Sequence, residues 1–408
     1  MAELLEVTLT ALAYGGEALG RDNLGRVVFV PYTLPDEQVR VEIGEAHAHW
    51  ARGRYTDLLA PSPERVPPRC RHYTVCGGCH YQHMNYPAQL RGKRTIVAAQ
   101  LERLGGLASP PVEETVPSPS PWHTRNRLQF SVDDLGRLGF QAAGTNQIVP
   151  ISECHLPEPA LADLWPRLDI GPVPGLHRIE VRSGADGECL VIFEADHDPD
   201  VELDLEIPDS LVWVSDGQST VLAGSGHLRM EVAGLSFRVS ADSFFQVHTT
   251  LAAELTRRAL ALLNVRPGQT VFDLYAGVGL FSAFLAQAGA RVVAVESSTA
   301  ACADFEVNLH DFDSIDLYEA SVEEAIPATG VHPDAVLVDP PRSGLGARVV
   351  DLLSAADIPR LVYISCDPAT LARDARRLSA QGFRLESVTP IDLFPQTYHI
   401  ETLSLWTR

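Results

Sequence analysis

The spacing of apolar residues in the first part of the chain predicts short strands. Over residues 6–59, β-branched runs are separated by turn residues such as Tyr14-Gly15-Gly16. Several short strands at this spacing predict a small β-barrel of the oligonucleotide-binding type over residues 1–60. Such barrels often bind single-stranded nucleic acid, although the architecture alone does not establish binding.

A helix and a long β-rich region follow. Residues 85–104 carry apolar side chains at helical spacing, with Arg91, Lys93 and Arg94 on the polar side, and two glycines end the helix. After a linker rich in proline and serine, residues 128–240 are mostly β-like with acidic loops and contain no catalytic constellation.

In the last part of the chain, apolar strands alternate with helices, which predicts a Rossmann-like sheet whose carboxyl edge binds ligands. The fold class is therefore α/β and β. The predicted domains are a barrel (1–60), a central β-rich domain (61–84 and 116–240), a helix packing on the catalytic domain (85–115), and the catalytic domain (241–408).

Cys366 lies where a predicted strand ends and a predicted helix begins. The run 361–364 is apolar and rich in β-branched residues, and Pro368 suits the first turn of a helix. A helix N-terminus favours an anion, so we expect a lowered thiol pKa and a populated nucleophilic thiolate. On position alone, a buried cysteine that fills space is the alternative.

A glycine-rich turn follows another predicted strand, in the pattern Asp273-x-x-x-Gly277-x-Gly279. Glycines there let a ligand approach the backbone. Glu296 ends the next strand, where an acid can hydrogen-bond a ribose. NAD is a rival ligand, but the third spaced glycine of its fingerprint is missing. The pattern favours S-adenosylmethionine.

Two further carboxylates are candidates for the same cleft. Asp339 ends a predicted strand, and the two prolines after it make a rigid loop that points the carboxylate at the cleft. Glu401 lies near the end of the terminal strand and is a candidate general base. A surface glutamate is the alternative for Glu401.

Three cysteines form a C-x5-C-x2-C run at Cys70, Cys76 and Cys79. Zinc and an iron–sulfur cluster both accept cysteinate ligands, and the spacing does not decide between them. A fourth ligand is needed, and Cys154 is a better candidate than Cys189, which lies in an apolar β-like run.

Charge is distributed unevenly along the 408 residues, whose net charge is −21. Residues 1–150 carry 15 basic and 15 acidic side chains, whereas 186–216 hold eleven acids and no Lys or Arg. Within the first part, residues 46–110 hold nine Arg or Lys against three acids. A basic stretch of this kind can still hold a polyanion on one face. No apolar run is long enough to cross a bilayer, and no signal sequence is evident, so we expect a cytoplasmic protein.

Taken together, these stretches resemble the RNA 5-methyluridine (uracil-C5) methyltransferases, in particular the bacterial 23S ribosomal RNA branch with a TRAM domain and an iron–sulfur cluster. The resemblance covers nearly the whole chain. Its motifs are Cys70-x5-Cys76-Gly-Gly-Cys79, Phe244-Phe245-Gln246-Val247, Asp273-Leu-Tyr-Ala-Gly-Val-Gly279, Asp339-Pro-Pro-Arg342, Ser365-Cys-Asp-Pro368, and Phe394-Pro-Gln-Thr397 with His399 and Glu401.

The resemblance implies two cofactors and their sites. It implies a 4Fe–4S cluster held by Cys70, Cys76, Cys79 and Cys154. It also implies S-adenosylmethionine beside the glycine turn, with Leu280 and Ser321 at two positions where family members often carry Asn. The other expected contacts of S-adenosylmethionine are Gln246, Tyr275, Gly277, Glu296 and Asp339.

The implied reaction is methylation of uracil C5 in single-stranded or flipped-out RNA. Cys366 would add to C6 and make C5 nucleophilic, and Glu401 would then remove the C5 proton. Most tRNA enzymes of this kind lack the barrel and the cysteine run, so 23S ribosomal RNA is the expected partner of a monomeric enzyme. The alternatives are a tRNA methyltransferase and a non-catalytic iron–sulfur RNA-binding protein.

Overall fold

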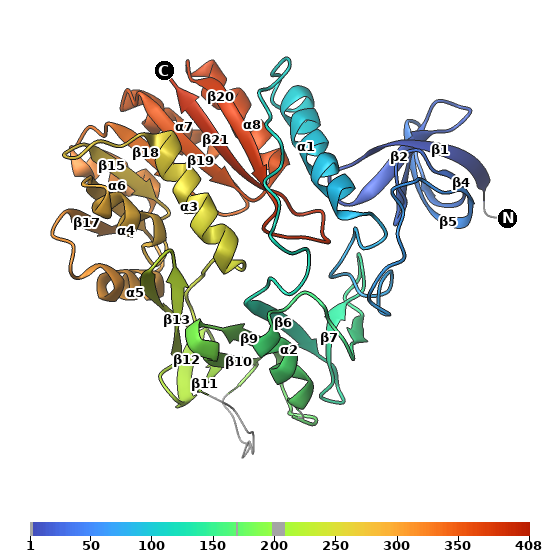
Figure 1. Ribbon diagram of the computed structural model, residues 1–408, viewed down its shortest axis with the longest axis horizontal. Helices are drawn as coiled ribbons and strands as arrows, with labels where there is room; N and C mark the ends of the chain where they lie inside the picture. The colour runs from blue at the N-terminus through green and yellow to red at the C-terminus, as the bar shows by residue number, and fades with distance from the viewer. Residues whose placement is uncertain (1–2, 169, 198–208) are drawn as a thin grey trace.

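The computed structural model contains a barrel, a central sheet and a C-terminal sheet, and one long helix lies between the barrel and the C-terminal sheet (Figure 1). The structure describes residues 3–168, 170–197 and 209–408. The acid-rich run 186–216 therefore lies partly outside the described residues, at 198–208. Within the described ranges, no helix has the length and apolar character needed to cross a membrane.

The first unit is a closed barrel with the strand order β1-β2-β3-β5-β4, as the sequence predicts. Alternate side chains point inward, and Leu9, Val28, Val30 and Val41 are fully buried in its core. Closure leaves no unpaired sheet edge. The strands are β1 (Leu4–Leu12), β2 (Glu17–Arg21), β3 (Val27–Pro31), β4 (Gln38–Ala46) and β5 (Trp50–Ala60).

Helix α1 (Tyr86–Arg103) lies between the barrel and the C-terminal sheet (Figure 1). The side chain of Asn85 caps it by accepting a hydrogen bond from the N–H of Ala88 at 3.0 Å. Its apolar face packs against α8 (Pro368–Ala380) in a shared core. Lys93 is fully buried. Its assignment to the polar face is therefore wrong, because the ammonium has buried acceptors that the helical spacing does not reveal.

The central unit is a seven-stranded sheet with the order β12-β11-β10-β9-β6-β7-β8. Only β10 and β11 run parallel. The short helix α2 (Pro159–Leu164) packs on one face, in a core that includes Cys189. The strands are β6 (Arg127–Val132), β7 (Leu138–Gln141), β8 (Ile148–Pro150), β9 (Leu176–Ser183), β10 (Cys189–Ala195), β11 (Ser210–Ser215) and β12 (Gln218–Ala223).

The catalytic unit is a second seven-stranded sheet, with the order β17-β16-β15-β18-β19-β21-β20. Strands β15 to β19 run parallel, whereas β21 pairs antiparallel with both β19 and β20. Helices α3, α4 and α5 pack on one face, and α1, α6, α7 and α8 pack on the other. This arrangement is the Rossmann-like three-layer fold that the sequence predicts.

The catalytic unit contains most of the helices of the described chain. Its strands are β15 (Thr270–Leu274), β16 (Arg291–Glu296), β17 (Ile315–Glu319), β18 (Ala335–Val338), β19 (Arg360–Ser365), β20 (Arg384–Ile391) and β21 (Glu401–Thr407). Its helices, besides α8, are α3 (Thr249–Leu263), α4 (Leu280–Gln287), α5 (Thr299–Leu309), α6 (Val322–Thr329) and α7 (Gly346–Ala355).

A hairpin of β13 (His227–Val232) and β14 (Leu235–Ser240) packs on the catalytic unit. Met230 and Phe237 lie in the same core as α3. A two-stranded hairpin cannot bury an apolar face by itself, so it requires such a partner. Leu228 of the same hairpin packs against Leu190 and Val212 of the central sheet, so the hairpin connects the two units on either side of the predicted boundary at residue 240.

Arg182 connects the central sheet to the start of the catalytic unit. Its guanidinium donates to the carbonyls of Ser240 at 3.0 Å, Ala241 at 2.7 Å and Ser243 at 2.9 Å, and it pairs with Glu180. Because one cation gathers three carbonyls of the same short segment, the guanidinium fixes the direction in which the chain leaves the hairpin.

We expect Arg182→Met to lower the free energy of unfolding by about 3 kcal/mol, because Glu180 and three carbonyls lose a largely buried partner. The matched control is Arg178→Met on the same strand, which removes an exposed pair with Glu194 and should cost less than about 1 kcal/mol. Thermal unfolding of the two variants checks the difference. Equal losses would contradict the role given to Arg182.

Candidate active site

Five strands of the catalytic sheet bring polar side chains to one edge. Tyr275 and Asp339 directly follow β15 and β18, Glu296 ends β16, and Cys366 directly follows β19. Strand β21 runs antiparallel to β19, so its first residue, Glu401, lies at the same edge. Residues that the sequence identifies in separate motifs are therefore brought together by the order and direction of the strands.

The pairing of β19 with β21 sets Cys366 opposite Glu401. Ser365 pairs with Thr402, and the Thr402 hydroxyl donates to the Ser365 carbonyl at 2.9 Å. One residue further along this antiparallel register stand Cys366 and Glu401. Cys366 lies between β19 and α8, as predicted, and is partly exposed, whereas Glu401 is buried.

The environment of Cys366 favours the thiol over the thiolate. Burial, followed by the negative charges of Glu401, Asp339 and Asp367, raises its pKa to about 12. The expected lowering of the pKa by the helix N-terminus is therefore wrong. The physical reason is that burial disfavours the charged thiolate and the nearby carboxylates repel it. In addition, the carboxylate of Asp367 already accepts hydrogen bonds from two first-turn N–H groups of α8 at 3.0 Å each.

Three carboxyl groups surround this edge: Asp273 and Glu401 are buried, and Asp339 is partly exposed. Burial raises the pKa of Asp273 to about 7, and its Oδ2 accepts a hydrogen bond from Ser282 at 2.6 Å while Oδ1 has no partner among the described residues. Burial and the charge of Asp273 raise the pKa of Asp339, and burial and Asp339 raise that of Glu401 well above its usual range. Protons can therefore be exchanged here near neutral pH.

The glycine turn after β15 has the features of a nucleotide-binding site. Glu296 accepts the N–H of Gly277 at 2.8 Å, and its other oxygen accepts the N–H groups of Ser297 and Ser298. Gly277 has a φ of +56°, and a Cβ added to it would meet no heavy atom within 4 Å. Open space beside the turn, a strand-end acid and the unpartnered Asp273 oxygen fit a ligand such as S-adenosylmethionine.

The remaining predicted cofactor contacts differ in where their side chains lie. The Gln246 amide donates to Asp339 at 3.4 Å, and the Asn126 amide holds the Gln246 carbonyl at 2.9 Å. The side chain of Leu280 is buried in the core, and the Ser321 hydroxyl donates to Glu324 at the start of α6. Only Gln246 of this group is hydrogen-bonded to a residue of the edge.

A second site lies against the central sheet, where one cavity of about 440 Å³ is lined by four cysteines. Burial raises the pKa of each of these thiols. Among residues 3–168, 170–197 and 209–408, no group of three or more His, Cys, Asp or Glu side chains is arranged to hold a metal ion. The cysteines of the cavity are Cys70, Cys76, Cys79 and Cys154.

Sequence patterns did not reveal one contact from the barrel to the active-site edge. The Tyr14 hydroxyl donates to Asp367 at 2.9 Å, and Arg342 donates to the same carboxylate oxygen at 3.2 Å. Tyr14 and Asp367 belong to different domains, so no local spacing links them. The sequence identifies Asp273 as the first residue of the glycine motif. It does not reveal that one carboxyl oxygen of Asp273 is buried without a hydrogen-bond partner among the described residues.

Comparisons with known proteins agree with this architecture. Residues 225–408 match the family model of tRNA (uracil-5-)-methyltransferases, and residues 3–56 match the TRAM domain. The chain is 33% identical to an uncharacterized RNA methyltransferase of Streptomyces coelicolor, over 99% of this chain and 93% of that protein. It is also 33% identical to an uncharacterized RNA methyltransferase of Aquifex aeolicus, over 98% of both.

Among solved structures, the chain is similar to the tRNA (uracil-54, C5)-methyltransferase of Pyrococcus abyssi in complex with S-adenosyl-L-homocysteine. The TM-score is 0.75 at 26% sequence identity, and the match covers 99% of both chains. Barrel, central region and catalytic sheet are thus all included in the similarity.

The buried Asp273 generates a prediction about stability and pH. Its pKa is about 7 in the folded protein against an ordinary value of 3.8, so its stabilising contribution is present below about pH 4 and is lost as the pH rises towards 7. Across this window, Asp273→Asn should therefore gain stability relative to wild type, by on the order of 3 kcal/mol.

Thermal unfolding of wild type and variant between pH 4 and 8 measures this difference, with the exposed Asp313→Asn as control. A difference between wild type and Asp273→Asn that stays constant with pH would contradict the raised pKa.

Proposed function

This chain belongs to the RNA uracil-C5 methyltransferases that have a TRAM domain and use S-adenosylmethionine, and we propose that it methylates C5 of a specific uridine in 23S ribosomal RNA. The observation that carries the proposed mechanism is the strand register that brings Cys366 beside Glu401, whose charge acts on the Cys366 thiol. S-adenosylmethionine supplies an electrophilic methyl group, and the residues of this chain supply the nucleophile and move the protons.

In the first step, the sulfur of Cys366 bonds to uracil C6. The electron pair of the C5–C6 double bond moves towards the C4 carbonyl and makes C5 nucleophilic. Burial and three carboxylates raise the pKa of the Cys366 thiol, so the thiol carries its proton before the reaction. This proton must therefore be transferred to an acceptor when the bond to C6 forms. Asp339 contributes to that shift and has a raised pKa of its own, so it is a suitable proton acceptor.

C5 would then bond to the methyl group of S-adenosylmethionine, and the electron pair of the broken S–CH3 bond would stay on the sulfonium sulfur. In the last step, Glu401 removes the remaining proton from the methylated C5. The released electron pair re-forms the C5–C6 double bond and expels the sulfur of Cys366, which regains a proton. The raised pKa of Glu401 makes its ionised carboxylate a stronger base than an exposed glutamate. Substrate uracil must leave its stack for this chemistry, because C6 is hidden within a helix.

Cofactor contacts follow from the glycine turn. Glu296 and Gly277 are proposed to hold the nucleoside part, beside Tyr275, and Asp339 and Gln246 lie towards the reacting atoms. The side chains of Leu280 and Ser321 are used elsewhere, so only their backbone groups are proposed to contribute.

A tRNA uridine is the second candidate substrate. The Pyrococcus abyssi tRNA enzyme matches this chain along its full length. The sequence analysis used the barrel to favour ribosomal RNA over tRNA. Because a tRNA enzyme matches this chain along its full length, the barrel does not distinguish the two substrates. The resemblance of the cysteine run to the 23S ribosomal RNA branch keeps that substrate as the first choice.

The four cysteines are proposed to hold a 4Fe–4S cluster. Four thiols around one cavity of about 440 Å³ form a suitable donor set. Zinc would accept the same thiolates. The proposal of a cluster over zinc rests on the resemblance of the cysteine run to the 23S ribosomal RNA branch. The expected role of the cluster is to fasten the segment before α1 to the central sheet.

We expect wild-type protein to transfer labelled methyl groups from S-adenosylmethionine to 23S ribosomal RNA transcripts, with all label recovered as 5-methyluridine. Cys366→Ala should abolish transfer, because no bond to C6 can form. Glu401→Gln should accumulate a protein–RNA adduct that survives denaturing electrophoresis, because elimination needs the base. Methyl transfer at the wild-type rate by Cys366→Ala would refute the mechanism.

Transcripts of tRNA are assayed in parallel. Label in tRNA alone would show that the substrate is tRNA and would leave the proposed mechanism unchanged. Label in neither RNA, from protein that holds an intact cluster, would favour a non-catalytic RNA-binding protein.

Anaerobically purified protein should contain about four irons and four sulfides per chain, the content of a cluster held by four cysteines. Cys154→Ser should lose most of this iron, whereas Cys189→Ser, which alters a core cysteine of the same sheet, should retain it. Metal analysis that finds one zinc per chain would contradict the cluster.

A further inference from the structure

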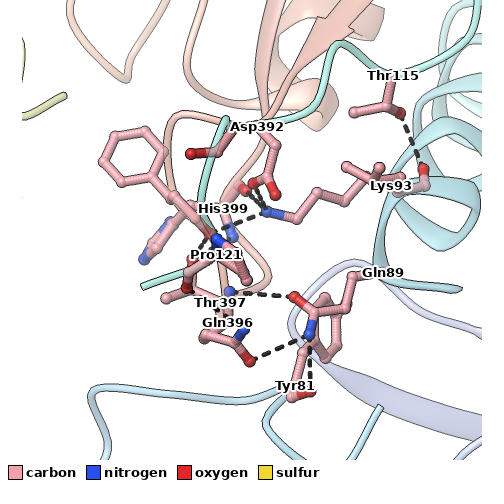
Figure 2. A network of polar contacts seen from close by, with 12 residues as sticks. Tyr81, Gln89, Lys93, Thr115, Pro121, Asp392, Gln396, Thr397 and His399 are labelled. Atoms are coloured by element: carbon pink, nitrogen blue, oxygen red, sulfur yellow. Dashed lines mark hydrogen bonds and ion pairs between the residues drawn. The ribbon is translucent and has the colours of Figure 1, made fainter. Parts of the chain in front are cut away.

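The only lysine of the chain is buried between α1 and the segment that leads to Glu401. Figure 2 shows the Lys93 ammonium directed at Asp392 and at the chain that follows it. It donates to Asp392 Oδ1 at 2.5 Å and to the carbonyls of Phe394 at 3.0 Å and His399 at 2.8 Å. All three donors of the ammonium are therefore used, and every acceptor lies within one stretch of eight residues.

A second contact from the same helix holds the middle of this segment. Gln89 and Gln396 exchange two hydrogen bonds, each 3.1 Å long, and the Gln89 amide also donates to the carbonyls of Tyr81 and Met84 (Figure 2). Gln89 and Lys93 are four residues apart, so they face the same side of α1. Side chains of α1 thus bind the segment through hydrogen bonds at positions 392, 394, 396 and 399.

A gain in stability does not by itself explain why a lysine is buried at position 93. A fully buried ion pair recovers little more than the cost of removing both charges from water, and a well-packed apolar pair of similar size is often as stable. What an apolar pair lacks is a donor for two carbonyls at opposite ends of a loop. The lysine selects one conformation of that loop.

The loop ends next to the proposed base. His399 lies two residues before Glu401, whose carboxyl stands opposite Cys366 through the β19–β21 register. We propose that Lys93 is a positioning residue for Glu401: by fixing both ends of residues 394–399, it sets where β21 begins and therefore where the base points. This inference rests on the proposed role of Glu401.

The test compares Lys93→Met with the double variant Lys93→Met/Asp392→Asn. The single variant leaves the Asp392 carboxylate buried without its cation and is expected to fold poorly. The double variant removes both charges and keeps an amide oxygen at position 392, so it should regain most of the thermal stability that the single variant loses, although the two carbonyls lack the ammonium donor. Arg91→Met, an exposed residue of the same helix paired with Glu64, is the matched control.

Catalysis separates positioning from structural support. The double variant should bind RNA and S-adenosylmethionine with unchanged KM values but show a kcat about tenfold to a hundredfold lower, the effect of a small misplacement of a reacting group. It should also accumulate the same denaturant-stable RNA adduct as Glu401→Gln. A folded double variant that turns over at the wild-type rate without adduct would overturn the inference.

Hydrogen exchange gives a readout that does not depend on activity. Backbone amides of residues 393–400 should exchange faster in the double variant than in wild type or Arg91→Met. Unchanged protection in this segment would overturn the inference even if the proposed function is correct. Methylation by Cys366→Ala would instead overturn the proposed function, while the exchange result would still decide whether Lys93 fixes the segment.

Discussion

The active-site edge depends on one antiparallel strand within an otherwise parallel region of sheet. Parallel strands deliver their carboxyl ends to one side, so a residue at the start of a further parallel strand would lie at the opposite side. Strand β21 runs the other way and is inserted between β19 and β20. Its first residue, Glu401, therefore reaches the edge where Cys366 and Asp339 lie. Reversal of this strand is what brings the proposed nucleophile and the proposed base to the same edge.

The electrostatics of the edge follow from the same arrangement. Burial raises the pKa of Cys366, and the charges of Glu401 and Asp339 raise it further; burial and Asp339 likewise raise the pKa of Glu401. Cys366 is consequently kept protonated in the free protein. A nucleophile that is inactive until a substrate is in place is protected from oxidation and alkylation, which depend on the thiolate.

The sequence predicted much of this fold because local patterns determine it. Alternating apolar residues define the barrel strands, and strand-then-helix runs define the catalytic sheet, including the position of Cys366. Spacing along the chain cannot predict a charge environment, since that depends on residues distant in sequence. The pKa of Cys366 was therefore predicted with the wrong sign: the helix N-terminus was visible, but the carboxyls of Asp339 and Glu401 act across strands. Lys93 was misassigned for the same reason, because its acceptors at Asp392, Phe394 and His399 lie in the last part of the chain.

The parts of the molecule expected to meet RNA are in direct contact with the catalytic edge. Tyr14 of the barrel donates to Asp367, the residue after the nucleophile. On the other side, α1 holds the segment before Glu401, and that segment also accepts the N–H groups of His80 and Tyr81, which follow the cysteine run. Displacement of the barrel or of the cysteine segment would therefore move the groups that flank Cys366 and Glu401. Contacts from the barrel and from the cysteine segment thus flank the site, even though the proposed reacting side chains come from one sheet.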